Sequence, residues 1–254
     1  MQHYFLQQHL QLGMELVLPS EIRKHWIQVL RAKSGSSAEF VDNNQQVYLG
    51  KLINPVTGLI AITASKNFQA ELPVQVTIAC GVPKSGKAEF IVQKATELGA
   101  TKIVFLPMEW SVARWQGKSE KKLLRLQKIA QGAAEQSHRN VIPTVMYTSG
   151  LPALNNLQAW DEKLVSYEEA AKQHEHQQLA KTLARTPVQS RIVALFGPEG
   201  GISPAEIAQL AALDFWPMGL GPRILRAETA PLYFFKCCFC ILRTKMLKWL
   251  HYRL

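Results

Sequence analysis

A lysine-bearing loop near residue 84 has almost the spacing of a phosphate-binding P-loop. In TIACGVPKSGKAEF, four residues separate Gly81 from Gly86, and Lys87 follows directly. A P-loop also needs Ser or Thr after the lysine, because that hydroxyl binds the Mg²⁺ held by the nucleotide phosphates. Ala88 stands there instead, and the apolar runs KIVFLPME and RIVALFGPE lack the aspartate that usually ends a companion strand. The pattern therefore argues against a nucleotide hydrolase and leaves the lysines to be explained.

A glycine-rich loop between an apolar run and a helix start is a second candidate for chemistry. RIVALF leads into GPEGG (residues 197–201), and Ser203, Pro204 and Glu206 then have the pattern of a capping-box helix start. Glycines at this place let backbone N–H groups approach a ligand closely. A tight strand-to-helix turn that needs glycine only for its backbone conformation is an equal alternative.

A second glycine-bearing loop follows one helix and one strand later, in FWPMGLGPRILRAETAPL. Two such loops at the carboxyl ends of strands can enclose a ligand between backbone segments, although Glu228 and Thr229 could instead cap the last helix. Neither loop has the G-x-G-x-x-G spacing of a dinucleotide site. The polar side chains of this loop are Arg223, Arg226, Glu228 and Thr229.

Alternating strand-like and helix-like segments from residue 74 predict the framework that carries these loops. The expected strands are VQVTIAC, KIVFLP, VIPTVMY, KLVSY, RIVALF and FWPMGL. The expected helices are KAEFIVQKATELG, SEKKLLRLQKIAQGAAEQS, EEAAKQHEHQQLAKTLA and SPAEIAQLAAL. This alternation favours an α/β fold with a mostly parallel sheet covered by helices. Ligands bind such sheets at the carboxyl ends of the strands, where both glycine loops are expected.

The first 72 residues have a different pattern, which predicts a small β-barrel with one helix. Strand-like runs flank the turns DNN (residues 42–44) and NPVTG (residues 54–58). The helix is expected to begin at the N-cap Ser20 and to end at Gly35, with an apolar stripe of Ile22, Trp26, Val29 and Leu30. We therefore expect one domain over residues 1–72 and an α/β domain over residues 73–254.

Composition indicates a globular chain with a basic middle. The 254 residues are 47% hydrophobic, enough to bury a substantial core, and carry a formal net charge of +10. Residues 73–150 hold the largest excess of Lys and Arg over Asp and Glu. A basic surface suits a polyanion such as RNA, because binding releases the counterions of its phosphates. Solvated lysine-rich helix faces are the alternative interpretation.

Several functional classes are disfavoured. No stretch approaches the roughly 20 apolar residues of a membrane span, and MQHYFLQQHLQLG lacks the basic flank and apolar centre of a signal peptide. A cytoplasmic location without membrane contact is therefore expected. The four cysteines do not form the two C-x-x-C pairs of a zinc site, because Cys80 stands alone and the other three crowd into residues 237–240, so no metal is expected.

The two glycine loops also carry a resemblance. GPEGGISPAEI followed by LGPRILRAETA resembles the signature of the SPOUT-class methyltransferases, and its form is similar to the RsmE family, which methylates N3 of a uridine in small-subunit ribosomal RNA. HWIQVLRAKSG, PKSGKAEFIVQKATELGA and AAEQSHRNVIP match further family segments in order. His3 stands where the family usually has an arginine, and FKCCFCILRTKMLKWLHYRL replaces an alanine- and leucine-rich helix.

The resemblance implies a PUA-like barrel followed by a SPOUT domain whose carboxyl end forms a trefoil knot. It also implies a homodimer, S-adenosylmethionine bound in the knot, and small-subunit ribosomal RNA or the assembled subunit as substrate. The matching cofactor positions in the first loop are Gly197, Glu199, Gly200 and Gly201. Those in the second loop are Leu220, Gly221, Ile224, Leu225, Arg226 and Thr229.

Methyl transfer from a sulfonium needs no covalent enzyme intermediate, so the protein must align uracil N3 with the methyl group and help its proton leave. The hypothesis is that Arg226 stabilises negative charge on a uracil carbonyl oxygen, while Glu228 orients Arg226 or accepts the proton. The orienting role is favoured, since a carboxylate beside a guanidinium is a poor base. Phosphate contacts are assigned to Arg31, Lys84, Lys87 and Arg139.

Two alternative functions stay open at this point. One is a SPOUT enzyme that methylates ribose 2′-hydroxyl groups, against which the barrel and the ILRAET sequence count. The other is a catalytically silent RNA-binding module whose knot no longer holds cofactor, an alternative kept because of the unusual carboxyl terminus.

Overall fold

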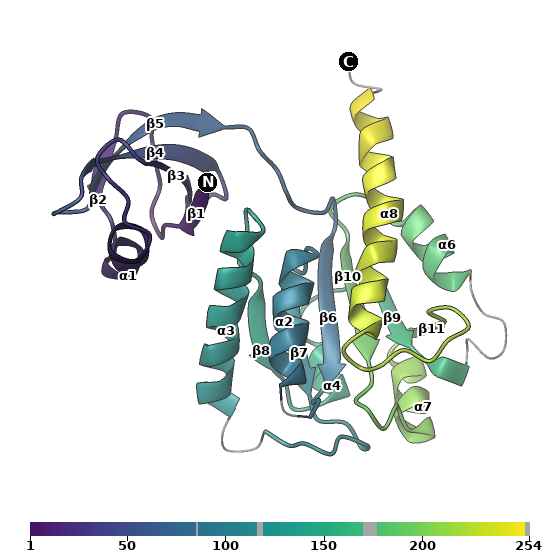
Figure 1. Ribbon diagram of the computed structural model, residues 1–254. Helices are drawn as coiled ribbons and strands as arrows, with labels where there is room; N and C mark the ends of the chain where they lie inside the picture. Colours follow the sequence, from purple (N-terminus) through teal and green to yellow (C-terminus); the bar gives the residue numbers. More distant parts are fainter. Residues whose placement is uncertain (85, 116–118, 170–176, 252–254) are drawn as a thin grey trace. The chain divides into compact units, whose positions relative to one another are not determined.

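The chain forms two compact units in a computed structural model that describes residues 1–84, 86–115, 119–169 and 177–251, with side chains up to residue 242 (Figure 1). Unit 1 consists of Met1–Glu71 together with Ala134–Val141. Unit 2 consists of Leu72–Ala133 together with Ile142–Leu254. The short segment 134–141 thus belongs to unit 1, whereas the sequence pattern assigns everything after residue 72 to the second domain.

Unit 1 is built on a five-stranded sheet, counted over its described residues, with the order β1-β3-β4-β5-β2. β1 pairs with β3 in parallel, and the remaining pairs are antiparallel. A core that includes Tyr4, Trp26 and Phe40 packs on this sheet. The strands are β1 (Gln2–Phe5), β2 (Glu15–Val17), β3 (Ser37–Val41), β4 (Val47–Asn54) and β5 (Leu59–Lys66).

The helix of unit 1 is shorter than predicted and changes type. An α-helical turn, α1 (Ser20–Arg23), continues as the π-helix η1 (Lys24–Val29). Pro19 is the N-cap residue, and no side chain caps the helix, so the prediction that Ser20 is the N-cap was wrong. Ser20 is the first helical residue instead.

The π-helix also explains why the predicted apolar stripe is only half buried. Ile22 and Trp26 lie in the core, but Val29 and Leu30 are exposed. The Leu30 N–H bonds to the carbonyl of His25, five residues earlier, and this wider turn rotates the following side chains away from the core.

Unit 2 contains a sheet of six parallel strands within the described residues, in the order β11-β9-β10-β6-β7-β8. The prediction of an α/β fold with a parallel sheet is confirmed. The strands are β6 (Gln75–Gly81), β7 (Lys102–Leu106), β8 (Thr144–Tyr147), β9 (Glu162–Ser166), β10 (Arg191–Phe196) and β11 (Trp216–Met218).

Helices cover both faces of this sheet. On one face, α2, α3, α6 and α8 share a core cluster with strand residues such as Ile78 and Phe105, while α4 and α7 pack with Val104 and Leu195 on the other. Figure 1 shows α8 lying along the sheet, in contact with α2 and α6. The bounds are α2 (Lys87–Glu97), α3 (Ser119–Gln136), α4 (Leu151–Asn155), α6 (Gln178–Arg185), α7 (Pro204–Ala212) and α8 (Ala230–His251).

The expected helix EEAAKQHEHQQLAKTLA is described at both ends, whereas its residues 170–176 lie outside the described part of the chain. Its carboxyl-terminal part forms α6. Over the described residues, none of the helices combines the length and apolar character that crossing a bilayer requires. Burial raises the pKa of the Cys80 and Cys238 thiols, which fits cysteines that pack as small apolar groups.

Candidate functional site

Both glycine loops border one cavity of about 1000 Å³ at the carboxyl ends of the strands of unit 2. We call residues 197–201, after β10, the glycine loop, and residues 219–229, between β11 and α8, the arginine loop. Ser166 and Tyr167, at the end of β9, and Trp110, after β7, complete the wall. The predicted cofactor residues that line this cavity are Gly197, Glu199, Gly200, Gly201, Leu220, Gly221, Ile224, Leu225 and Arg226.

The start of α7 fixes the end of the glycine loop as the sequence predicts. The Ser203 hydroxyl accepts from the Glu206 N–H at 3.2 Å, and Glu206 Oε2 accepts from the Ser203 N–H at 3.0 Å. Pro204 occupies the first turn. The capping box is therefore confirmed.

Close packing explains the glycines of this loop. A Cβ on Gly197 would lie 2.7 Å from Ile202 Cγ1, and one on Gly200 would lie 2.9 Å from Trp110 Cβ. Gly201 has a left-handed φ of +84°. Positive φ is thus a reason for one glycine, whereas the other two are needed where neighbouring groups come too close for a side chain.

The arginine loop is more open. Ile224 is 75% exposed and Arg226 is exposed, while the half-buried Leu225 packs against the main core of unit 2. Thr229 is not among the residues that line the cavity, and its N–H bonds to the Arg226 carbonyl at 2.8 Å in the turn that leads into α8. The loop therefore presents an apolar side chain and a guanidinium to solvent at the mouth of the cavity.

Lys87 links the two loops. Its ammonium nitrogen lies 3.1 Å from Glu199 Oε1 in the glycine loop and 2.8 Å from Glu228 Oε2 in the arginine loop. The N–H of Lys84 also donates to Glu199 Oε1, at 3.1 Å. Lys87 is predicted from the sequence to contact RNA phosphates, but in the structure two carboxylates hold its ammonium group.

These contacts keep all three groups charged. The hydrogen bond to Glu228 raises the pKa of Lys87, and the same contact is the main cause that lowers the pKa of Glu228. Burial opposes ionisation of Glu199, but hydrogen bonds from the backbone and Lys87 outweigh it and lower its pKa. Arg226 lowers the pKa of Glu228 less than Lys87 does, so Lys87 is the main partner of this carboxylate in the structure.

The remaining predicted RNA contacts differ in exposure. Arg31 and Lys84 are exposed. Arg139 is 3% exposed, and its guanidinium forms an ion pair with Glu71 within unit 1. This buried position turns the Arg139 side chain toward a carboxylate of its own unit, which does not favour the predicted phosphate contact.

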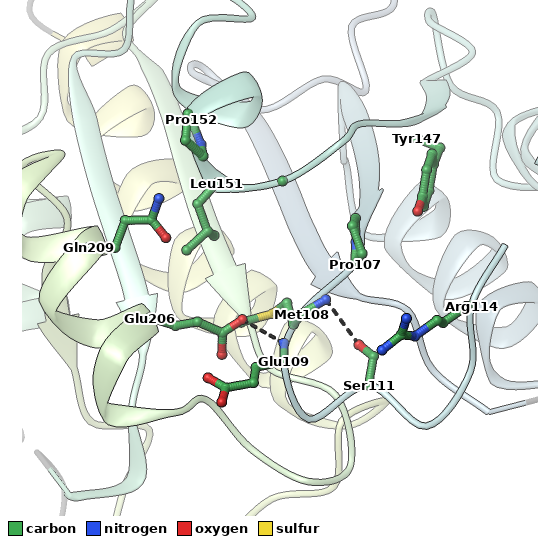
Figure 2. Close-up of a pocket in the computed structure, with 11 residues that line it drawn as sticks. Pro107, Met108, Glu109, Ser111, Arg114, Tyr147, Leu151, Pro152, Glu206 and Gln209 are labelled. Carbon is green, nitrogen blue, oxygen red and sulfur yellow. Dashed lines mark hydrogen bonds between the residues drawn. The ribbon is translucent and has the colours of Figure 1, made fainter. Parts of the chain in front are cut away.

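A second cavity, of about 340 Å³, lies at the carboxyl ends of β7 and β8 (Figure 2). Glu206 extends from α7 to its rim, where Oε1 accepts from the Glu109 N–H at 2.8 Å, and Arg114 and Tyr147 lie on its opposite side. This cavity was not predicted from the sequence, although the rule that sites gather at the carboxyl ends of strands applies to PMEWSVAR as well. Glu206 thus ties the start of α7 to the segment that follows β7.

Comparisons with known proteins fit this geometry. A family model described as an RNA methyltransferase domain matches residues 70–238. Ribosomal RNA small subunit methyltransferase E of Bacillus subtilis is 44% identical over 169 residues, or 66% of each chain, and its Synechocystis counterpart is 34% identical over 82% of this chain and 67% of its own. This chain thus spans about two thirds of the length of those two relatives.

A solved structure of ribosomal RNA small subunit methyltransferase E from Neisseria gonorrhoeae, bound to S-adenosyl methionine, is similar over nearly the whole chain. It superimposes with a TM-score of 0.83 at 28% identity, and the match covers 94% of this chain and 97% of that one.

Proposed function

The chain belongs to the RNA methyltransferase family, and from this premise we propose that it transfers the methyl group of S-adenosylmethionine to N3 of a uridine in small-subunit ribosomal RNA. The observation that carries the proposal is the cavity between the glycine loop and the arginine loop, whose two sequence motifs are those of the RsmE family. In the relative from N. gonorrhoeae the bound ligand is S-adenosyl methionine.

The residues around the cavity fit this cofactor. Its volume of about 1000 Å³ is at the upper end of the range for pockets that enclose small molecules. Glu199 Oε2 is buried and has no hydrogen-bond partner among the described residues, so it can accept from a donor or cation of the ligand. S-adenosylmethionine offers a sulfonium, an ammonium group and ribose hydroxyls, all of which suit such an acceptor.

When bound, S-adenosylmethionine supplies an activated methyl group. The backbone of the glycine loop would hold the cofactor closely, and the exposed Arg226 would donate to a uracil carbonyl oxygen and stabilise the charge that develops as the N3 proton leaves to solvent water at the open mouth of the cavity. Glu228 is a poor base because its contact with Lys87 lowers the pKa of this carboxyl, so we assign it a positioning role. It would hold the arginine loop against Lys87 rather than orient Arg226.

The finer architecture follows as part of the same proposal. The β-rich unit 1 would be the PUA-like barrel, with Arg31 at an RNA-facing surface. The path of the arginine loop into α8, which packs between α2 and α6, supports a trefoil knot at the carboxyl end of unit 2. We extend the family's homodimer to this chain as well, with Lys84 among the groups that contact RNA.

Substitution of Arg226 by Ala tests the assignment. We expect calorimetry to show S-adenosylmethionine binding close to wild type, while methylation of small-subunit RNA falls by about 100-fold or more, since the lost interaction forms in the transition state. Mass mapping of the product nucleoside should place the methyl group on the uracil ring. A ribose 2′-O-methyl product, or an unchanged rate in the variant, would contradict the proposal.

A further inference from the structure

Unit 1 contains a cluster of side chains that the proposed methyl transfer does not use. His3 on β1, Glu39 on β3 and His138 in the segment 134–141 direct three ligand atoms to one point, all within 4.8 Å of one another. Glu39 Oε2 lies 3.0 Å from His3 Nδ1 and 2.7 Å from His138 Nδ1. The ring of His3 is fully buried, whereas that of His138 is about one third exposed.

Hydrogen bonding fixes the His3 ring in an informative orientation. His3 Nε2 lies 2.8 Å from the backbone carbonyl oxygen of Arg139, which can only accept, so Nε2 carries a hydrogen. A neutral ring then presents the lone pair of Nδ1 to the lone pairs of Glu39 Oε2. Two acceptors at 3.0 Å require a positive centre between them, which is either a proton or a metal ion.

We propose that His3, Glu39 and His138 form a binding site for a divalent transition metal of the Zn²⁺ type. Two imidazole nitrogens and one carboxylate oxygen are ligands that Zn²⁺ accepts, and a water would complete the tetrahedron. Bonds of about 2.0–2.1 Å place tetrahedral ligand atoms about 3.3 Å apart. The two histidine–carboxylate distances of 3.0 and 2.7 Å therefore have to lengthen by only about 0.3–0.6 Å, and the two imidazole nitrogens already lie within 4.8 Å of each other.

The surroundings of the cluster match the outer contacts of metal sites. Ligating histidines usually donate their other ring N–H to a carbonyl or carboxylate, as His3 does to Arg139, and ligating carboxylates are themselves hydrogen-bonded. Lys66 Nζ lies 2.5 Å from Glu39 Oε1, which orients the carboxylate and leaves Oε2 for the ion. The same ammonium repels a cation, so it lowers the affinity of the site.

His138 is the ligand through which an ion can reach the site, and its backbone conformation is one that the surrounding structure must hold in place. Its ring is more exposed than that of His3 or the carboxylate of Glu39, so a metal can enter and leave there. Its backbone φ of 55° lies in the left-handed region, which costs energy for a residue other than glycine and persists only where the surroundings hold it. A bound ion would link β1, β3 and the segment 134–141 within unit 1.

The experiment is a calorimetric titration of the full chain with Zn²⁺, repeated with Co²⁺ so that visible absorption reports the ligand geometry. We expect one ion per chain with a dissociation constant below about 10 µM near pH 7.5, and weaker binding at pH 5.5, because protons compete for the imidazoles. His138→Ala, at the more exposed ring, should weaken binding by about 100-fold or more. Lys66→Met should tighten it.

A matched control exists in the same unit. His9 Nδ1 lies 3.0 Å from Asp42 Oδ2, a histidine–carboxylate pair that lacks the second histidine of the cluster. His9→Ala should leave the binding of Zn²⁺ unchanged, and circular dichroism checks that each variant is folded. Absence of binding in both the wild type and Lys66→Met would overturn the proposal and identify protons as the occupants. An equal loss in His9→Ala and His138→Ala, or no loss in His138→Ala, would overturn it too.

Discussion

The glycine loop and the arginine loop border the same cavity, but different forces hold them in place. The glycine loop is determined locally, by a capping box and by glycines that neighbouring groups approach within 3 Å. The arginine loop has few local constraints, and it exposes Ile224 and Arg226 at the cavity mouth. Its charged anchor is Lys87, which lies more than 130 residues earlier in the chain and holds Glu228.

This difference suggests a division of labour. A wall that is fixed before binding can position a cofactor without further ordering cost, whereas an open wall can adapt to an incoming base. Damage to the glycine loop should therefore affect both folding and cofactor binding. Damage to the arginine loop should affect catalysis or affinity with little effect on folding.

The largest effect is expected from Gly197→Ala. The new methyl group would lie 2.7 Å from Ile202 Cγ1 and 3.0 Å from the Gly201 carbonyl carbon, both of which are held by the start of α7. We expect the free energy of unfolding to fall by about 1–3 kcal/mol, as in overpacked cores, and S-adenosylmethionine affinity to fall with it. Denaturant unfolding and calorimetry measure the two effects.

Gly132→Ala is the matched control, because Gly132 lies inside α3 with no atom within 4 Å of an added Cβ. This substitution should stabilise the chain by about 0.5–1 kcal/mol. If Gly197→Ala behaves like Gly132→Ala, the glycine loop is not held by packing and the contrast between the loops fails.

The second-largest effect is expected from Lys87→Met, which removes the cation between the loops. Glu199 and Glu228 then lose the ammonium group that compensates their charges, and the arginine loop loses its anchor. We expect kcat/KM for methyl transfer to fall by about 10–100-fold, comparable to a misplacement of about 1 Å. Lys94→Met is the control, since Lys94 lies on the same helix α2 but its ammonium group pairs with Glu97 of that helix.

The pH dependence of stability should differ between the wild type and Lys87→Met in a direction that the pKa shifts determine. The pKa of Glu228 is lowered from 4.5, so its contribution is present above that value and is lost as the pH falls through the folded pKa. The pKa of Lys87 is raised from 10.5, so its contribution is present below that value and is lost at higher pH. Wild type should exceed Lys87→Met in stability from about pH 5 to 10, and the difference should shrink outside this window.

The sequence predicts the features that depend on neighbouring residues, but it does not predict contacts between distant residues. Helix starts, strands and the parallel sheet of unit 2 depend on neighbouring residues, so the residues SPAEI are enough to predict the capping box. Lys87 and Arg139 could not be placed, because their carboxylate partners are distant in the chain. A basic residue in a loop predicts a positive charge, but it does not show whether that side chain will form an ion pair with a carboxylate of the same protein.

Neither the π-helix nor the cluster around Glu39 leaves a signal in the local sequence. A shift from four-residue to five-residue hydrogen bonds leaves no mark in the periodicity of a six-residue segment, so Val29 and Leu30 were predicted to face the core. His3 and His138 are 135 residues apart, and no spacing rule for metal ligands connects them. The fold alone brings them to one carboxylate.

A smaller effect is expected from Ser203→Ala, which removes the hydroxyl of the capping box. The Glu206 N–H loses its acceptor, and the free energy of unfolding should fall by about 1 kcal/mol. Ser20→Ala is a matched control, since Ser20 is the first residue of a helix that no side chain caps. A melting temperature lowered equally in both variants would show that the capping box does not stabilise the glycine loop.

The smallest effect on folding is expected from Ile224→Ser in the arginine loop. Because Ile224 is 75% exposed, the free energy of unfolding should change by less than about 0.5 kcal/mol. An isoleucine at the mouth of a cavity can still contribute apolar contact to a ligand, so S-adenosylmethionine affinity should fall by about 3–10-fold. Leu225→Ser is the comparison, because Leu225 packs on the core and its loss should cost stability first. If Ile224→Ser lowers stability as much as Leu225→Ser while affinity is unchanged, the arginine loop is a structural element like the glycine loop, and the proposed division between a fixed and an adaptable wall is wrong.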